Sequence, residues 1–212
     1  MLPFFRELLV NISASEALAQ LKAGNQRFAS GNPANHSTAA RRAALLSGQR
    51  PKAVILGCSD SRVPAEIVFD QSLGDLFVIR VAGNIVAPSQ IGSIEFAVEQ
   101  FRTRLVVVLG HSHCGAIGAT IDALRNPDTQ HSRNMRSIVE RIKPAIVSLD
   151  IAESENHETL VALAVRANIV YSVRQLRHGS PILEDFMQRA GVEIVGAEYS
   201  LESGIVTFLS DP

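Results

Sequence analysis

The chain has 212 residues, of which 46% are hydrophobic and 19% are charged. This length and composition predict one globular domain with a sizeable buried core. The formal net charge of -1 and the isoelectric point near 6.6 lack the basic excess that binding to nucleic acid or to an anionic membrane needs. We therefore expect neither a nucleic acid nor a membrane among its partners.

Targeting signals are not evident in the sequence. Residues 1–10 are apolar, but Arg6 and Glu7 interrupt them and no small-residue cleavage site follows. The other apolar runs are far shorter than the ~20 residues that a membrane-spanning helix requires. These features predict a cytoplasmic protein.

The first predicted helix follows Ser13, which forms the spacing of a capping box with Glu16. Apolar residues then recur at roughly helical spacing as far as Gly31, and residues 41–46 suit a second short helix. We interpret residues 13–50, approximately, as a helical arm on a single domain that comprises the whole chain, residues 1–212.

Three apolar runs rich in β-branched residues predict buried parallel strands, at residues 52–57, 76–81 and 105–110. The apolar pattern of residues 89–104 suits a helix that crosses between the second and third strands. The predicted fold class is therefore α/β, with a mainly parallel central sheet and flanking helices.

The last part of the chain predicts two helices and a hairpin. A long helix is expected at residues 158–178, and a shorter one begins at Pro181 and ends at Gly191. Residues 192–199 and 205–209 then have the pattern of two strands, which predicts a hairpin at the edge of the sheet.

Candidate metal ligands follow two of the predicted strands. Cys58 and Asp60 come after the first strand, and His111 and Cys114 come after the third. Ligand sites of open α/β sheets collect beyond the carboxyl ends of the strands, and two thiolates with one imidazole suit zinc with a fourth position for water or a carboxylate. The alternatives for the two cysteines are buried thiols, a disulfide or a redox pair, although they lack Cys-x-x-Cys spacing.

The motifs around these residues closely resemble those of the β-class carbonic anhydrases. They are Cys-Ser-Asp-Ser-Arg at 58–62, Asp-Leu-Phe-Val-Ile-Arg-Val-Ala-Gly-Asn at 75–84 and Gly-His-Ser-His-Cys-Gly at 110–115, with Gly-Asn-Gln-Arg-Phe at 24–28 also similar. The resemblance covers nearly the whole chain. It implies zinc-dependent, reversible hydration of carbon dioxide to bicarbonate and a proton by metal-bound hydroxide, with one ion per subunit.

The resemblance also assigns roles to individual residues. It implies that Cys58, His111 and Cys114 bind zinc, and that Asp60 and Arg62 are the catalytic pair of the family. Asp60 has two alternative positions: held by Arg62 it can orient the water that zinc activates, whereas as a fourth zinc ligand it would exclude that water. In either case we expect activity to rise toward alkaline pH.

A substrate pocket shared between subunits, and hence a homodimer or a larger homo-oligomer, is a further implication. Gln49 and Phe77 match pocket residues of the plant-like subclass, and Gly115 in the third motif is assigned to the pocket with them. Phe96 stands at a pocket position where the family commonly has Tyr, so a role for that hydroxyl is missing here. Ile55 stands where the bicarbonate-inhibited subclass carries Trp, which favours the plant-like subclass.

Two other functions are compatible with these motifs. A protein of the same fold could hydrolyse carbon disulfide or carbonyl sulfide, because the chemistry is shared. A bicarbonate sensor without turnover is the second, although Asp60 and Arg62 count against it. A nucleotide-binding module is set aside because residues 110–115 fit neither the dinucleotide nor the Walker pattern.

His113 is a weaker candidate, as a proton relay.

Overall fold

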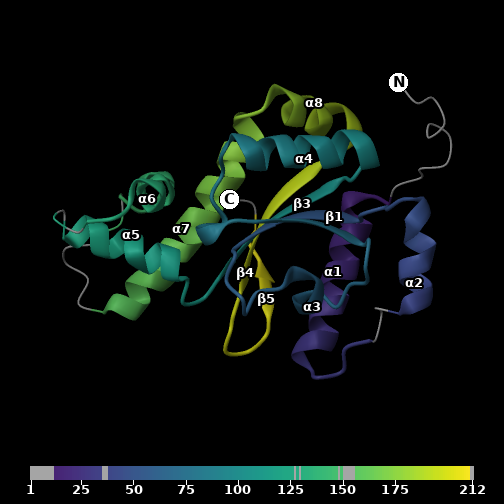
Figure 1. The fold of residues 1–212 in the computed structure, drawn as a ribbon, viewed down its shortest axis with the longest axis horizontal. Helices are drawn as coiled ribbons and strands as arrows, with labels where there is room; N and C mark the ends of the chain where they lie inside the picture. The colour runs from purple at the N-terminus through teal and green to yellow at the C-terminus, as the bar shows by residue number, and fades with distance from the viewer. Residues whose placement is uncertain are drawn as a thin grey trace.

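The computed structural model describes residues 12–34, 38–126, 128, 130–147, 149 and 156–210. Residues 1–10, considered above for a targeting signal, and residues 35–37 of the predicted arm lie outside them. The strands of the described part form one sheet in the order β2-β1-β3-β4-β5 (Figure 1). Their bounds are Ala53–Gly57 for β1, Leu76–Arg80 for β2, Leu105–His111 for β3, Glu193–Tyr199 for β4 and Val206–Phe208 for β5.

The first four strands of the sheet are parallel, and β5 is antiparallel to β4. The register places Gly57 of β1 beside Leu109 of β3, so the carboxyl ends of these two strands are adjacent. Every residue of β1 and β3 is buried, as continuous apolar runs predict for strands covered on both faces. The predicted α/β class, the parallel sheet and the terminal hairpin are confirmed.

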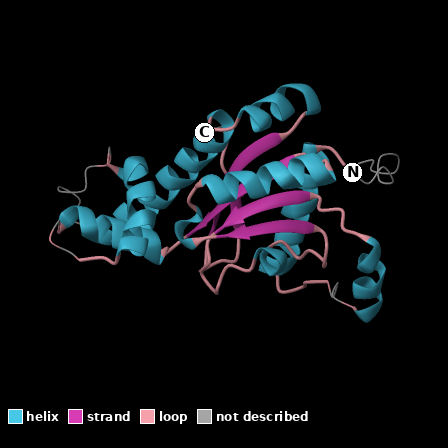
Figure 2. Cartoon of the chain, turned by 45° about the horizontal axis from the view of Figure 1, so that its top comes forward, coloured by secondary structure: helices cyan, strands magenta, loops and turns pink. Residues whose placement is uncertain are grey.

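Helices cover both faces of the sheet (Figures 1 and 2). The side chains of β1 alternate between two hydrophobic clusters, because Val54 and Leu56 pack on one face and Ala53 and Ile55 on the other. The first cluster includes residues of α4 (Pro88–Phe101), α5 (Gly115–Arg125), α6 (Arg133–Ile146), α7 (His157–His178) and α8 (Pro181–Ala190). The second includes residues of α1 (Ala14–Ala29) and α3 (Ala65–Val68).

A buried asparagine of α1 joins this helix to α3 and to the hairpin of β4 and β5. The Nδ2 atom of Asn25 donates to the carbonyl oxygens of Val68 (3.1 Å) and Gly204 (2.8 Å), and its Oδ1 accepts from the N–H of Val206 (2.8 Å). A buried amide with three satisfied bonds fixes the position of its helix. The short helix α2 (Ala39–Ala44) follows α1 near the region where the sequence predicts one.

Most predicted helices are confirmed, with shifts at their ends. The helix α4 ends at Phe101 rather than at residue 104, because Arg102 adopts a left-handed conformation with φ 56°. The pattern does not predict α3, α5 or α6. The helix α3 is a single turn, whereas α6 carries Val139, Ile142 and Ile146 at helical spacing, a signal from which it could have been found.

Membrane-spanning helices were sought in the same structure. Among the residues that it describes, no helix combines the length and the apolar character needed to cross a bilayer.

Candidate metal centre

Three predicted ligands meet beyond the carboxyl ends of β1 and β3. Cys58 follows β1 directly, His111 is the last residue of β3, and Cys114 is the N-cap residue of α5. All three are buried, and their ligand atoms lie within 4.8 Å of one another. The parallel pairing of two neighbouring strands is what brings these distant parts of the chain together.

The His111 ring is fully buried and has a defined orientation. Its Nδ1 lies 2.8 Å from the carbonyl oxygen of Ser112, so Nδ1 carries the proton and donates it to that oxygen. Its Nε2 finds no hydrogen-bond partner among the described residues. Burial works to lower the pKa of His111, but the nearby Cys58 sulfur raises it on balance. A buried nitrogen lone pair without a partner beside two thiols fits a metal ligand.

A backbone N–H group points at the sulfur atom of Cys58. The N–H of Gly83 donates to Cys58 Sγ at 3.3 Å, whereas the side chain of Cys114, the N-cap residue of α5, accepts no capping hydrogen bond. A hydrogen bond from Cys114 lowers the pKa of Cys58 well below its usual range, and the same contact raises the pKa of Cys114. One thiol is therefore readily ionised, and a bound cation would favour the thiolate form of both.

Asp60 lies beside the cluster and is held by Arg62. The guanidinium donates from Nε to Oδ1 (2.9 Å) and from Nη2 to Oδ2 (2.7 Å), and the backbone N–H of Arg62 also donates to Oδ1 (2.9 Å). These bonds hold the pKa of Asp60 well below its usual range. The Oδ2 atom is 3.9 Å from His111 Nε2. Of the two alternative positions for this carboxylate, the structure has the one paired with arginine.

Arg80 braces the loop that carries Cys58 and Asp60. Its Nε donates to the carbonyl oxygen of Cys58 (3.1 Å) and its Nη2 donates to the carbonyl oxygen of Asp60 (2.6 Å). Both bonds go to backbone atoms, so they fix the loop without competing for the ligand atoms. Arg80 and Gly83 both belong to the motif at residues 75–84, so the motif could have drawn attention to them. The sequence analysis assigns neither residue a role in the site.

His113 is exposed and turns toward the hairpin. Its Nε2 pairs with Glu202 Oε1 in the turn between β4 and β5, and Ser112 donates to Oε2 of the same carboxylate (2.9 Å). Hydrogen bonds from its own backbone N–H and from Ser200 and Ser112 lower the pKa of Glu202 to about 2. The His113 side chain is thus engaged with the hairpin, and nothing in the sequence identifies Glu202 as its partner.

The residues expected to bind substrate are not all near the cluster. Gly115 adjoins Cys114, and the space beside its Cα is open. Phe77 pairs with Val54, four residues before Cys58, which places it about 13 Å away along the strand direction.

Gln49 and Phe96, the other two residues that match pocket positions of the family, lie toward the same end of the strands as Phe77. The ring of Phe96 on α4 packs 6.2 Å from the ring of Phe77 and is half exposed. Gln49 is exposed just before β1. Within one chain, Gln49, Phe77 and Phe96 therefore lie toward the amino ends of the strands, opposite the cluster.

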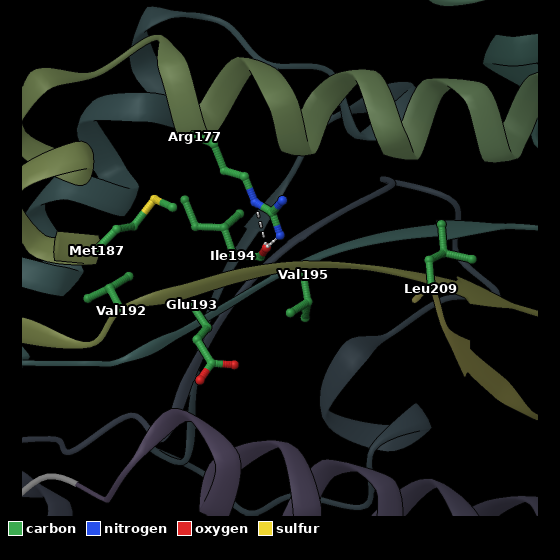
Figure 3. Close-up of a pocket in the computed structure, with 7 residues that line it drawn as sticks. All are labelled: Arg177, Met187, Val192, Glu193, Ile194, Val195 and Leu209. Atoms are coloured by element: carbon green, nitrogen blue, oxygen red, sulfur yellow. Dashed lines mark hydrogen bonds between the residues drawn. The ribbon is translucent and has the colours of Figure 1, made fainter. Parts of the chain in front are cut away.

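A separate cavity lies between α7, α8 and β4 (Figure 3). Its volume is about 390 Å³. Arg177 reaches over it from α7 and donates to the carbonyl oxygen of Ile194 from Nε (3.2 Å) and Nη2 (2.7 Å). Glu193 and Val195 point to the other side of the strand (Figure 3). None of the predicted site residues lines this cavity, so we do not connect it with the metal centre.

Comparison with known proteins decides the family. The family model described as Carbonic anhydrase matches residues 53–206, which include the entire Cys-His-Cys cluster. The chain belongs to the carbonic anhydrase family. Carbonic anhydrase 2 of Mycobacterium tuberculosis is 39% identical over 206 residues, covering 87% of this chain and 99% of that protein. The carbonic anhydrase of Mycolicibacterium smegmatis is 41% identical over 201 residues, covering 94% and 95%.

Solved carbonic anhydrases have the same fold. The β-carbonic anhydrase CafA of Aspergillus fumigatus superposes with a TM-score of 0.73 at 25% identity, covering 93% of this chain and 91% of that one. The similarities confirm the predicted β-class family, and they support carbon dioxide hydration by a lyase of this family.

Proposed function

We propose that the chain is a zinc-dependent carbonic anhydrase that interconverts carbon dioxide and bicarbonate, with one zinc ion held by Cys58, His111 and Cys114. The observation that carries the proposal is the buried cluster of these three side chains, with His111 Nε2 unpartnered among the described residues, in a chain of this family. Zinc would act there as a Lewis acid that lowers the pKa of water, so that the nucleophile toward carbon dioxide forms near neutral pH.

Asp60 and Arg62 are proposed as the catalytic pair. Arg62 keeps the carboxylate ionised and occupied on both oxygens, which leaves Asp60 as a fixed hydrogen-bond acceptor beside the cluster. Such an acceptor can hold the proton of a reacting water and thereby direct its lone pair toward the substrate. This help matters because two thiolates cancel the formal charge of a zinc ion and weaken its effect on water.

We propose that the active protein is a homodimer or a larger homo-oligomer of single-domain subunits. Gln49, Phe77 and Phe96 are too far from the cluster of their own chain to contact a substrate there, and a second copy could present the same residues to it. The two aromatic rings would supply an apolar wall for carbon dioxide, and the Gln49 amide would supply a donor. Gly115 would leave room for the substrate beside Cys114.

The plant-like subclass and a cytoplasmic location complete the proposal. Ile55 is fully buried in β1 at the position where the bicarbonate-inhibited subclass is expected to carry Trp. Both cysteines of the chain belong to the proposed metal site, so none is assigned to a stabilising disulfide of the kind that secreted proteins use.

Metal removal tests the proposed function. Stopped-flow measurement of carbon dioxide hydration on protein of known zinc content is expected to show turnover proportional to bound zinc. Dialysis against a chelator should abolish the activity, and stoichiometric zinc should restore it. Protein that holds one zinc per chain but does not hydrate carbon dioxide would contradict the proposal and favour a sensor or a hydrolase of carbon disulfide or carbonyl sulfide.

The pH profile is a second prediction. Because Arg62 holds the pKa of Asp60 far below neutrality, Asp60 stays ionised over the whole working range. The rate should therefore follow the ionisation of one water, rising about tenfold per pH unit on the acid side and levelling in alkali. Stopped-flow kcat/KM between about pH 5 and pH 9 measures it. A flat profile would be inconsistent with this mechanism.

A further inference from the structure

The helix α7 buries two polar side chains against the loop that follows β2. Asn168 and Ser172 are each 1% exposed and lie one turn apart on the same face of the helix. Asn168 Nδ2 donates to the carbonyl oxygen of Gly83 at 2.8 Å, and Ser172 Oγ donates to the carbonyl oxygen of Asn84 at 3.3 Å. The helix therefore holds two consecutive carbonyl groups of this loop.

Gly83 connects this anchor to the metal centre. Its carbonyl accepts from Asn168, while its own N–H donates to Cys58 Sγ at 3.3 Å. The backbone of Gly83 is left-handed, with φ 68° and ψ 21°, and a Cβ there would lie 2.7 Å from Ile142 Cδ1 and 3.2 Å from Ala116 Cβ. Only glycine fits this tight turn, and the direction of its N–H depends on how its peptide groups are held.

We infer that Asn168 is a positioning residue of the metal centre, because it fixes the Gly83 carbonyl and so aims the Gly83 N–H at the Cys58 sulfur. The inference rests on the proposed function, in which that sulfur is a zinc ligand. A hydrogen bond to a ligating thiolate orients it and draws charge away from the metal. In a site with two thiolates, this contact restores part of the Lewis acidity that the sulfur charge removes.

The Ser172→Ala variant is a matched control that tests whether Asn168 has only a structural role. Ser172 lies on the same helix, is equally buried and donates the same kind of hydrogen bond, in its case to the next residue of the loop. Within the described part of the chain, its acceptor residue, Asn84, makes no hydrogen bond to a ligand sulfur, whereas Gly83, the residue held by Asn168, donates to Cys58 Sγ. Loss of packing between α7 and the loop would affect both variants, but loss of ligand orientation would affect only one.

The experiment compares Asn168→Ala, Ser172→Ala and wild type as full chains. Zinc affinity is measured by competition with a chromogenic chelator, and the sulfur-to-cobalt charge-transfer absorption is recorded after substitution with Co²⁺. We expect Asn168→Ala to weaken zinc binding by about 10- to 100-fold and to shift the absorption. Ser172→Ala should stay within about twofold of wild type with an unshifted spectrum. The nearly isosteric Asn168→Leu, which removes the amide donor and keeps most of the side-chain volume, tests the same point if the alanine variant does not fold.

The outcomes separate this inference from the proposed function. If the wild-type protein binds neither zinc nor cobalt through its cysteines, both the proposed function and the inference about Asn168 are wrong. Wild-type binding with an unchanged affinity and spectrum in Asn168→Ala or Asn168→Leu overturns the role of Asn168 alone. Equal changes in the Asn168 and Ser172 variants also overturn it, because they would show that general packing of α7 is responsible.

Discussion

The His111→Ala variant is expected to lose bound zinc and to lower carbon dioxide hydration by at least about 1,000-fold, because water without the metal keeps a pKa of ~15.7. His111 supplies the nitrogen of the proposed Cys2His set, and its Nε2 has no other hydrogen-bond partner among the described residues. The remaining two sulfur atoms do not make a closed site. Zinc content by atomic absorption and stopped-flow hydration measure the two losses in the same sample.

His113→Ala is the matched control for this variant. His113 is two residues away in the same loop, but it is exposed and paired with Glu202. We expect His113→Ala to keep one zinc per chain and most of the activity. Added imidazole can enter the space left in His111→Ala, so partial recovery of zinc binding is expected there. Full zinc occupancy in His111→Ala without imidazole would refute the proposed ligand set.

The Gly24→Ala variant is expected to lower the free energy of unfolding by about 3 kcal/mol, although alanine is the better helix former by about 1 kcal/mol. A Cβ on Gly24 would lie 1.8 Å from the backbone oxygen of Phe69 and 2.9 Å from Gln71 Nε2. Because a backbone atom cannot rotate away, α1 must move off α3. That movement would also break the bonds of Asn25 to Val68 and Gly204.

Urea denaturation followed by circular dichroism measures this effect. Gly92→Ala is the control, since Gly92 lies within α4 and a Cβ there meets nothing within 4 Å. We expect Gly92→Ala to be as stable as wild type or up to about 1 kcal/mol more stable. If Gly24→Ala matches Gly92→Ala in its denaturation midpoint, the close contact between α1 and α3 does not constrain the fold.

The strands of the parallel sheet and three candidate metal ligands could be predicted from residue patterns and motifs. Buried strands at β1, β2 and β3 follow from apolar runs, a property of adjacent residues that needs no knowledge of the rest of the chain. Once two neighbouring parallel strands are assigned, their carboxyl ends must adjoin, and Cys58, His111 and Cys114 come with them. The strand ends thus predicted where these side chains lie, and the resemblance to the β-class carbonic anhydrases implied their role as metal ligands.

The arrangement of the groups around that cluster follows from tertiary packing and not from residue spacing. The pairing of Asp60 with Arg62 depends on side-chain rotamers, which residue spacing does not fix. The contact of Asn168 with Gly83 joins residues 85 positions apart, and it exists because α7 packs across the loop after β2. Hydrogen bonds between distant side chains and backbone depend on the packed position of whole elements, so local sequence patterns carry no signal for them.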